Sequence, residues 1–100
     1  MPSIVFVTQK QNRDPLRPNH VQEWVDFAGP QSEKGAFLIS AFALHTTGPQ
    51  QSDTVRVEDI RVETTRDRKG DPTHRLHFQV RNVGSSTIRR YVVNVWHVLP

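Results

Sequence analysis

The sequence predicts an all-β protein, an antiparallel β-sandwich of six to seven strands, and three observations lead to this fold class. Several short segments alternate apolar and polar residues with a period of two, the pattern of a strand that has one buried and one solvated face. Proline, glycine, asparagine and aspartate are concentrated in the loops between these segments. The segments also recur at the short spacing that is typical of sandwiches.

Length and composition indicate one folded domain, residues 1–100. Apolar residues make up 35% of the chain and charged residues 23%, which is polar for a globular domain but too rich in valine, isoleucine and phenylalanine for disorder. We expect no membrane span and no signal peptide in the chain as given, because no apolar run approaches roughly 20 residues and the N-terminus lacks a basic start, a longer apolar stretch and a cleavage site. Secretion stays open. With no cysteine, disulfides and thiol chemistry are excluded and the compartment stays open.

The N-terminal half predicts three strands. Residues 4–8 form a short apolar strand, and the proline-containing loop 9–20 is expected to give nothing to the core. Residues 36–44 are apolar on both faces, which fits either a strand covered on both sides or a buried helix; we adopt the strand. Residues 21–27 alternate, with Val21, Val25 and Phe27 on one side and Gln22, Trp24 and Asp26 on the other, polar side.

A change of phase marks the strand over residues 54–64. Val55 and Val57 occupy odd positions, whereas Ile60 and Val62 occupy even ones, so a regular strand cannot keep both pairs inside. The sequence therefore predicts either a β-bulge at Glu58-Asp59 or a break after which the chain crosses to another sheet. The next segment, RDRKGDP, reads as a hairpin loop in which Gly70 takes the left-handed position.

Residues 73–98 read as two long strands joined by a short turn. Asn82 and Gly84 are suited to the positive backbone angles of a reversal, so a hairpin is predicted here. The first strand alternates cleanly, whereas the second, from Ile88 to Val98, is largely apolar on both faces. Since a sandwich strand keeps one face wet, something must cover the second face of this strand.

We therefore expect an apolar sheet face that is buried against another subunit or a neighbouring domain, so that the protein is a homo-oligomer or part of a larger assembly. Cover by the N-terminal 30 residues, or by a helix at 36–45, is the alternative within one chain. The residues expected at the interface are Tyr91, Val92, Val93, Trp96 and Val98.

The C-terminal part resembles a known family. Residues 58–62, the strand and turn of residues 76–84, and the strand from Ile88 are similar to bacterial Ig-like domains of the cell-adhesion-related type. This resemblance covers about the last 45 residues and implies an Ig-like sandwich used for adhesion, spacing or binding, without catalytic residues. Thr87-Ile88 and Val95-Trp96 also resemble the last strand of the H-type lectins, six-stranded sandwiches that bind sugars as trimers.

The motifs of catalysis and of cofactor binding are missing from the sequence. The glycines are too far apart for a phosphate-binding loop, and no nucleophile elbow occurs. His74 and His77 are three residues apart on a strand and so point to opposite faces, and Asp67 and Asp71 fit a turn better than a calcium site. We expect no metal, no cofactor and no enzymatic activity.

Two kinds of ligand remain. Trp24, beside Gln22 and Asp26, could offer a stacking platform to a glycan. A nucleic-acid partner would require one continuous patch of Arg66, Arg68, Lys69 and Arg75, and it is not expected because bases and acids alternate. The sequence thus predicts a non-catalytic binding or assembly module that self-associates through an apolar sheet face; the alternative is a carbohydrate-binding, lectin-like domain.

Overall fold

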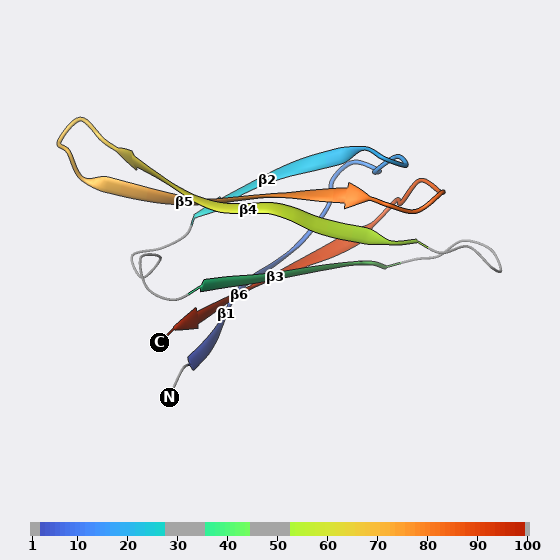
Figure 1. Ribbon diagram of the computed structural model, residues 1–100, viewed down its shortest axis with the longest axis horizontal. Coiled ribbons are helices and arrows are strands. Elements are labelled where there is room, and N and C mark those ends of the chain that lie inside the picture. The colour runs from blue at the N-terminus through green and yellow to red at the C-terminus, as the bar shows by residue number, and fades with distance from the viewer. Residues whose placement is uncertain (1–2, 28–35, 45–52, 100) are drawn as a thin grey trace.

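The computed structural model describes residues 3–27, 36–44 and 53–99, and these form an all-β structure (Figure 1). Residues 36–43 form a strand, so the helix alternative for this segment is wrong. None of the described residues belongs to a helix that could cross a membrane. The six strands are β1 (Ser3–Gln11), β2 (Val21–Phe27), β3 (Ala36–Ala43), β4 (Val55–Arg66), β5 (Pro72–Asn82) and β6 (Tyr91–Leu99).

The strands form two antiparallel three-stranded sheets, with the orders β1-β6-β3 and β2-β5-β4. Figure 1 shows them as two layers, with β3 passing below β4. The last strand, β6, is therefore the centre of one sheet, and β5 is the centre of the other. Six strands in two antiparallel sheets fall within the predicted six to seven strands of an all-β fold. Strand β1 extends three residues beyond the predicted end at Thr8.

The predicted hairpin between β5 and β6 is wrong, because the two strands belong to different sheets. Asn82 stays in the extended strand, and its buried side chain organises the connection between the sheets. Its Nδ2 donates to the carbonyl oxygens of Leu16 at 2.9 Å and Ser86 at 2.8 Å, while its Oδ1 accepts from the Gly84 amide at 2.9 Å. At the Asn-Val-Gly segment the chain therefore leaves the sheet of β5 and passes to the sheet of β6.

The core lies between the sheets and includes one residue from the proline-containing loop. Leu16 is only 1% exposed and exchanges two backbone hydrogen bonds with Ile88, so the expectation that this loop gives nothing to the core is wrong. The two residues close one end of the sandwich. The other buried members of the core are Leu76, Phe78, Val80, Tyr91, Val93 and Val95.

The predicted bulge in β4 is confirmed. The pairing of β4 with β5 shifts between Glu58 and Arg61, and Asp59 adopts a positive φ of 55°. The strand continues in the same sheet beyond the bulge, so it does not cross over. The extra residue accounts for the phase change, because one additional position exchanges the two faces of the strand.

The β4–β5 hairpin ends in a turn that is closed by its own residues. Gly70 has a φ of 86°, as the loop sequence predicts. The Asp67 carboxylate accepts hydrogen bonds from the backbone amides of Lys69 and Asp71 at 2.8 and 2.9 Å, which is the turn-forming role expected for this aspartate. Within the described ranges, no group of three or more histidines and carboxylates could hold a metal ion.

The bulge also places a carboxylate between two arginines. Glu58 accepts from Arg81 Nε at 2.8 Å and from Arg56 Nη2 at 2.9 Å. The hydrogen bond from Arg81 holds the pKa of Glu58 below its ordinary value of 4.5, and Arg56 adds to the effect against an opposing contribution from partial burial. The lowered pKa means that Glu58 binds a proton more readily in the unfolded chain than in the folded one.

We expect the stabilisation from Glu58 to be complete above pH 4.5 and to be lost as the pH falls through the lowered folded pKa. Glu58→Gln should therefore lower the melting temperature at neutral pH and reduce its acid dependence. Thermal melts of both proteins between neutral pH and pH ~3 test this, since acid losses are set by such shifted carboxylates. Equal acid losses in the two proteins would contradict the assignment.

Candidate functional site

The two faces of β6 have different environments. Tyr91 and Val93 are 0% and 1% exposed and belong to the core, so they cannot form part of an exposed interface as the sequence suggested. Val92, Trp96 and Val98 alternate with the core residues and point to the outside of the β1-β6-β3 sheet. Three of the five predicted interface residues therefore lie on the outer face, where Val92 is only 4% exposed.

These three residues belong to a larger surface, which we call the neutral face. Its most exposed apolar side chains are Ile4 at 64%, Leu38 at 54%, Phe42 at 49% and Trp96 at 37%. A polar line crosses its middle, where Gln9 Nε2 donates to Asn94 Oδ1 at 3.0 Å and Ser40 pairs with Asn94. The described side chains of this face are Ile4, Gln9 and Gln11 of β1, Ala36, Leu38, Ser40 and Phe42 of β3, and Val92, Asn94, Trp96 and Val98 of β6; none is charged.

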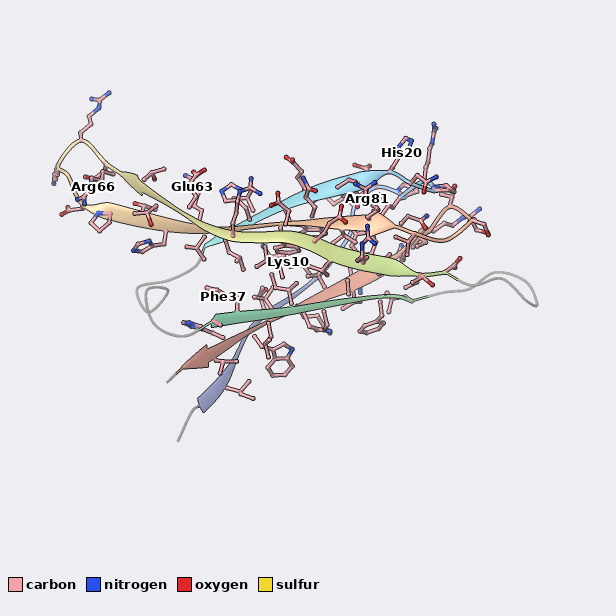
Figure 2. All side chains as sticks on the ribbon, viewed as in Figure 1. Lys10, His20, Phe37, Glu63, Arg66 and Arg81 are labelled. Carbon is pink, nitrogen blue, oxygen red and sulfur yellow. The ribbon has the colours of Figure 1, made fainter. Side chains whose placement is uncertain are left out.

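The outer face of the opposite sheet has the reverse character. Glu58 pairs with Arg81 and Arg56, and His77 Nε2 lies 3.8 Å from Glu63 Oε2. Figure 2 shows Glu63 on the side that faces away from the other sheet, whereas Phe37 lies between the sheets. The alternating charges of β4 thus form a solvated strand face, and the two outer faces of the sandwich differ sharply in charge.

Trp24 and Gln22 lie on the inner side of β2, so the sequence-based interpretation of their face as the outward, polar side is wrong. The indole stacks on Phe78 with ring centroids 6.0 Å apart and an interplanar angle of 3°, and meets Tyr91 edge-on at 70°. Val25 is instead 51% exposed on the outside of the sheet. The backbone of Asp26 pairs with Leu76, while its side chain lies outside the described part of the structure.

A chain of hydrogen bonds fixes the Trp24 side chain. Its Nε1 donates to the Tyr91 hydroxyl at 2.9 Å, the hydroxyl donates to Gln22 Oε1, and Gln22 Nε2 donates to the Asp14 carbonyl oxygen at 2.9 Å. Burial raises the pKa of Tyr91 to about 12, against an opposing effect of the bond from Trp24. The tyrosine therefore stays protonated and keeps its donor at neutral pH.

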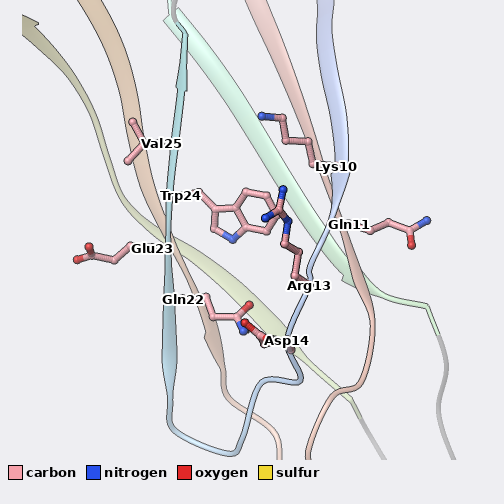
Figure 3. Close-up of a pocket in the computed structure, with 8 residues that line it drawn as sticks. All are labelled: Lys10, Gln11, Arg13, Asp14, Gln22, Glu23, Trp24 and Val25. Carbon is pink, nitrogen blue, oxygen red and sulfur yellow. Dashed lines mark hydrogen bonds between the residues drawn. The ribbon is translucent and has the colours of Figure 1, made fainter.

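An open cleft of about 640 Å³ runs between the edge strands β1 and β2 (Figure 3). Trp24 extends from the β2 wall toward the opposite wall, which carries Lys10 and Arg13. Glu23 and Val25 contribute to the rim but point away from the opening. The sequence predicted Trp24 and Gln22 as ligand-binding residues, and the structure brings both to this cleft.

Sequence reasoning missed the residues of the facing wall. Lys10, Arg13 and Asp14 belong to the end of β1 and to the following loop, a segment with no alternating pattern of its own. Only the pairing of β1 with β6, across more than 80 residues, sets this segment opposite β2. A cation-rich loop between two strands was the available signal, but it does not specify the strand that the loop faces.

The basic residues considered for nucleic acid lie on the β4–β5 hairpin, and Figure 2 shows Arg66 at its tip. Arg66 donates to the Gly70 carbonyl oxygen at 3.0 Å and so takes part in the turn. Arg75 pairs in register with Glu63, and Asp67 and Asp71 lie in the turn itself. Carboxylates thus interrupt the basic residues along the hairpin.

Comparison with known protein families, with curated proteins and with solved structures gives no match for this chain. The resemblances to Ig-like domains and to H-type lectins therefore rest on the sequence motifs alone. The neutral face and the β1–β2 cleft are defined by the geometry of this protein.

Proposed function

We propose that this protein is a non-catalytic assembly module that self-associates through the neutral face. The observation that carries the proposal is the contrast between the two outer sheet faces: one is charged, and the other exposes Ile4, Leu38, Phe42 and Trp96 without any charged neighbour among its described side chains. Contiguous apolar surfaces of this kind mark interaction sites in soluble proteins.

A second copy of the chain is the partner that fits this face best. A neutral face gives no electrostatic preference for a charged partner, since complementary charge is what steers such pairs. Its polar line consists of amides and a hydroxyl, which both donate and accept hydrogen bonds and can therefore pair with themselves across a two-fold axis. Gln9, Ser40 and Asn94 supply these groups.

The size of the face sets the expected affinity. Three strands of about eight residues cover a footprint of about 14 by 26 Å, using strand spacings of about 4.8 Å and rises of about 3.3 Å per residue. Such a footprint, about 360 Å² on each copy, is smaller than the roughly 800 Å² per partner of a standard interface, so the contact is expected to be weak. We therefore expect association in the micromolar range, which is accessible to sedimentation analysis.

Leu38→Lys should make the protein monomeric at tens of micromolar, where the wild type is expected to form a dimer or higher oligomer. Leu38 is 54% exposed on β3, an edge strand of the neutral face, so lysine there places a charge within the otherwise uncharged contact. Val25→Lys is the matched control, because Val25 is also on an edge strand and 51% exposed, but on the opposite sheet. Sedimentation velocity over a concentration series measures the effect.

Two results would overturn the proposal. One is a wild type that remains monomeric over the whole concentration series. The other is an oligomer that Val25→Lys disrupts as strongly as Leu38→Lys, which would place the contact elsewhere. Circular dichroism of each variant confirms that the fold is retained.

A further inference from the structure

The β1–β2 cleft is a second surface of the molecule, which adjoins the neutral face at Gln11. It has a volume of about 640 Å³, within the range of about 300–1,000 Å³ that is usual for small-molecule sites. We infer that this cleft binds a sugar that carries a carboxylate, with Trp24 stacking on the sugar ring and Arg13 pairing with the carboxylate. The inference does not depend on self-association.

Trp24 is held ready for stacking before any ligand arrives. Phe78 supports the indole from within the core, and the hydrogen bonds through Tyr91 and Gln22 to the Asp14 backbone fix its orientation. A ligand therefore does not have to immobilise this side chain, a cost that otherwise reduces affinity. The indole N–H is already satisfied, so the ring offers its apolar surface, which suits the C–H groups of a sugar.

Arg13 supplies the charged contact. It is exposed, it faces Trp24 across the cleft in Figure 3, and within the described residues it forms no ion pair. Its guanidinium can hold a carboxylate through two parallel hydrogen bonds. Lys10 lies on the same wall, so the positive charge is concentrated on one side of the opening.

The remaining polar groups favour a sugar over a nucleotide. The Asp14 carboxylate lies in the lining next to Arg13 and can accept hydrogen bonds from hydroxyl groups, several of which a sugar ring supplies. The lining also has no glycine-rich loop or helix N-terminus, the usual cradles for phosphate. One anionic group beside several hydroxyls, as in a uronic or sialic acid, matches this set.

The two tryptophans allow a direct test, because one lies in the cleft and the other on the neutral face. The full chain, labelled with ¹⁵N, is titrated with the methyl glycosides of galacturonate, glucuronate and N-acetylneuraminate, and with their uncharged methyl esters. Trp96→Phe assigns the two indole N–H resonances. We expect at least one acidic sugar to shift the Trp24 resonance and leave that of Trp96 in place, and its ester to bind about tenfold more weakly or worse.

Arg13→Gln should weaken binding of the same acidic sugar by about tenfold or more. Arg17→Gln is the matched control, since it removes the same charge from the same loop but lies outside the residues that line the cleft, and it should leave binding unchanged. The inference fails if none of the acidic sugars shifts the Trp24 resonance at millimolar concentration, or if adenosine monophosphate binds more tightly than all of them. It also fails if the two arginine variants lose affinity equally.

Discussion

Replacing Asn82 by alanine is expected to lower the free energy of unfolding by about 3 kcal/mol, because it removes a buried side chain that makes three hydrogen bonds to the backbone. The Asn82 side chain is 0% exposed and satisfies the carbonyl oxygens of Leu16 and Ser86 together with the Gly84 amide. Alanine can replace none of these bonds, although the Leu16 carbonyl keeps the bond from the Ile88 amide. The loss should appear as an earlier midpoint in urea denaturation with an unchanged slope.

Gln79→Ala is the control for this prediction, since Gln79 is another amide on the same strand. It faces the outer side of the sheet and makes one hydrogen bond of 3.3 Å to Glu23, so its removal should cost less than about 0.5 kcal/mol. Asn82→Asp separates the donor role from the acceptor role, because aspartate keeps an acceptor for the Gly84 amide but loses both donated bonds. Stability of Asn82→Asp close to that of the wild type would contradict the assigned bonds.

Tyr91→Phe is expected to lower the free energy of unfolding by about 2 kcal/mol at neutral pH, since it removes the hydroxyl that joins Trp24 to Gln22. The ring is fully buried and phenylalanine fills nearly the same volume, so the loss comes from the two unsatisfied polar groups. Urea denaturation measures it. In NMR spectra, the indole N–H resonance of Trp24 should move while that of Trp96 stays in place.

The Tyr91→Phe variant should also differ from the wild type in how its stability depends on alkaline pH. Burial raises the pKa of Tyr91 from 10.0 to about 12, so the folded state keeps a proton that the unfolded chain releases earlier. The stabilisation is complete below pH 10 and is lost as the pH rises toward 12. Tyr91→Phe should lack this alkaline loss. Because the chain has a single tyrosine, its absorbance follows the ionisation directly, and a titration midpoint near 10 in the folded protein would contradict the buried hydroxyl.

The strands and the bulge could be predicted from the sequence because both depend on local alternation. Each of the six strands overlaps a predicted strand, by alternation for β2, β4 and β5 and by apolar residues on both faces or in a short run for β1, β3 and β6. The phase change between Val57 and Ile60 located the irregularity that the structure places after Glu58. In such segments the alternation of apolar and polar residues indicates directly which side chains are buried. The two-layer architecture follows from their number and spacing.

The partners of the strands could not be predicted in the same way. Asn82 and Gly84 signal a change of direction, but the signal is the same whether the chain returns to its own sheet or crosses to the other one. The crossing depends on Leu16, which lies 66 residues away from Asn82 and accepts its hydrogen bond. Local turn chemistry contains no information on a contact of that separation.

The cleft shows why polarity alone can misassign a face. Gln22 looks like a surface residue, yet its amide bonds to the Tyr91 hydroxyl and to the Asp14 backbone on the inner side of β2, whereas the apolar Val25 points outward. A polar side chain can be internal when its hydrogen bonds are satisfied there. Since the partners come from the loop after β1 and from β6, the internal face of β2 becomes recognisable only once the fold is assembled.

The central position of β6 has a consequence for how the chain folds during synthesis. Strands β1 and β3 do not pair with each other. Each pairs with β6, which is the last of the six strands to be synthesised. The β2-β5-β4 sheet can form earlier, because it needs no residue beyond Asn82 for its ladder. Non-local pairing of this kind slows folding and leaves strand edges exposed in the nascent chain. Gln9, Lys10 and Gln11 at the end of β1 suit such an unpaired edge, because polar and charged side chains on an edge strand oppose edge-to-edge association.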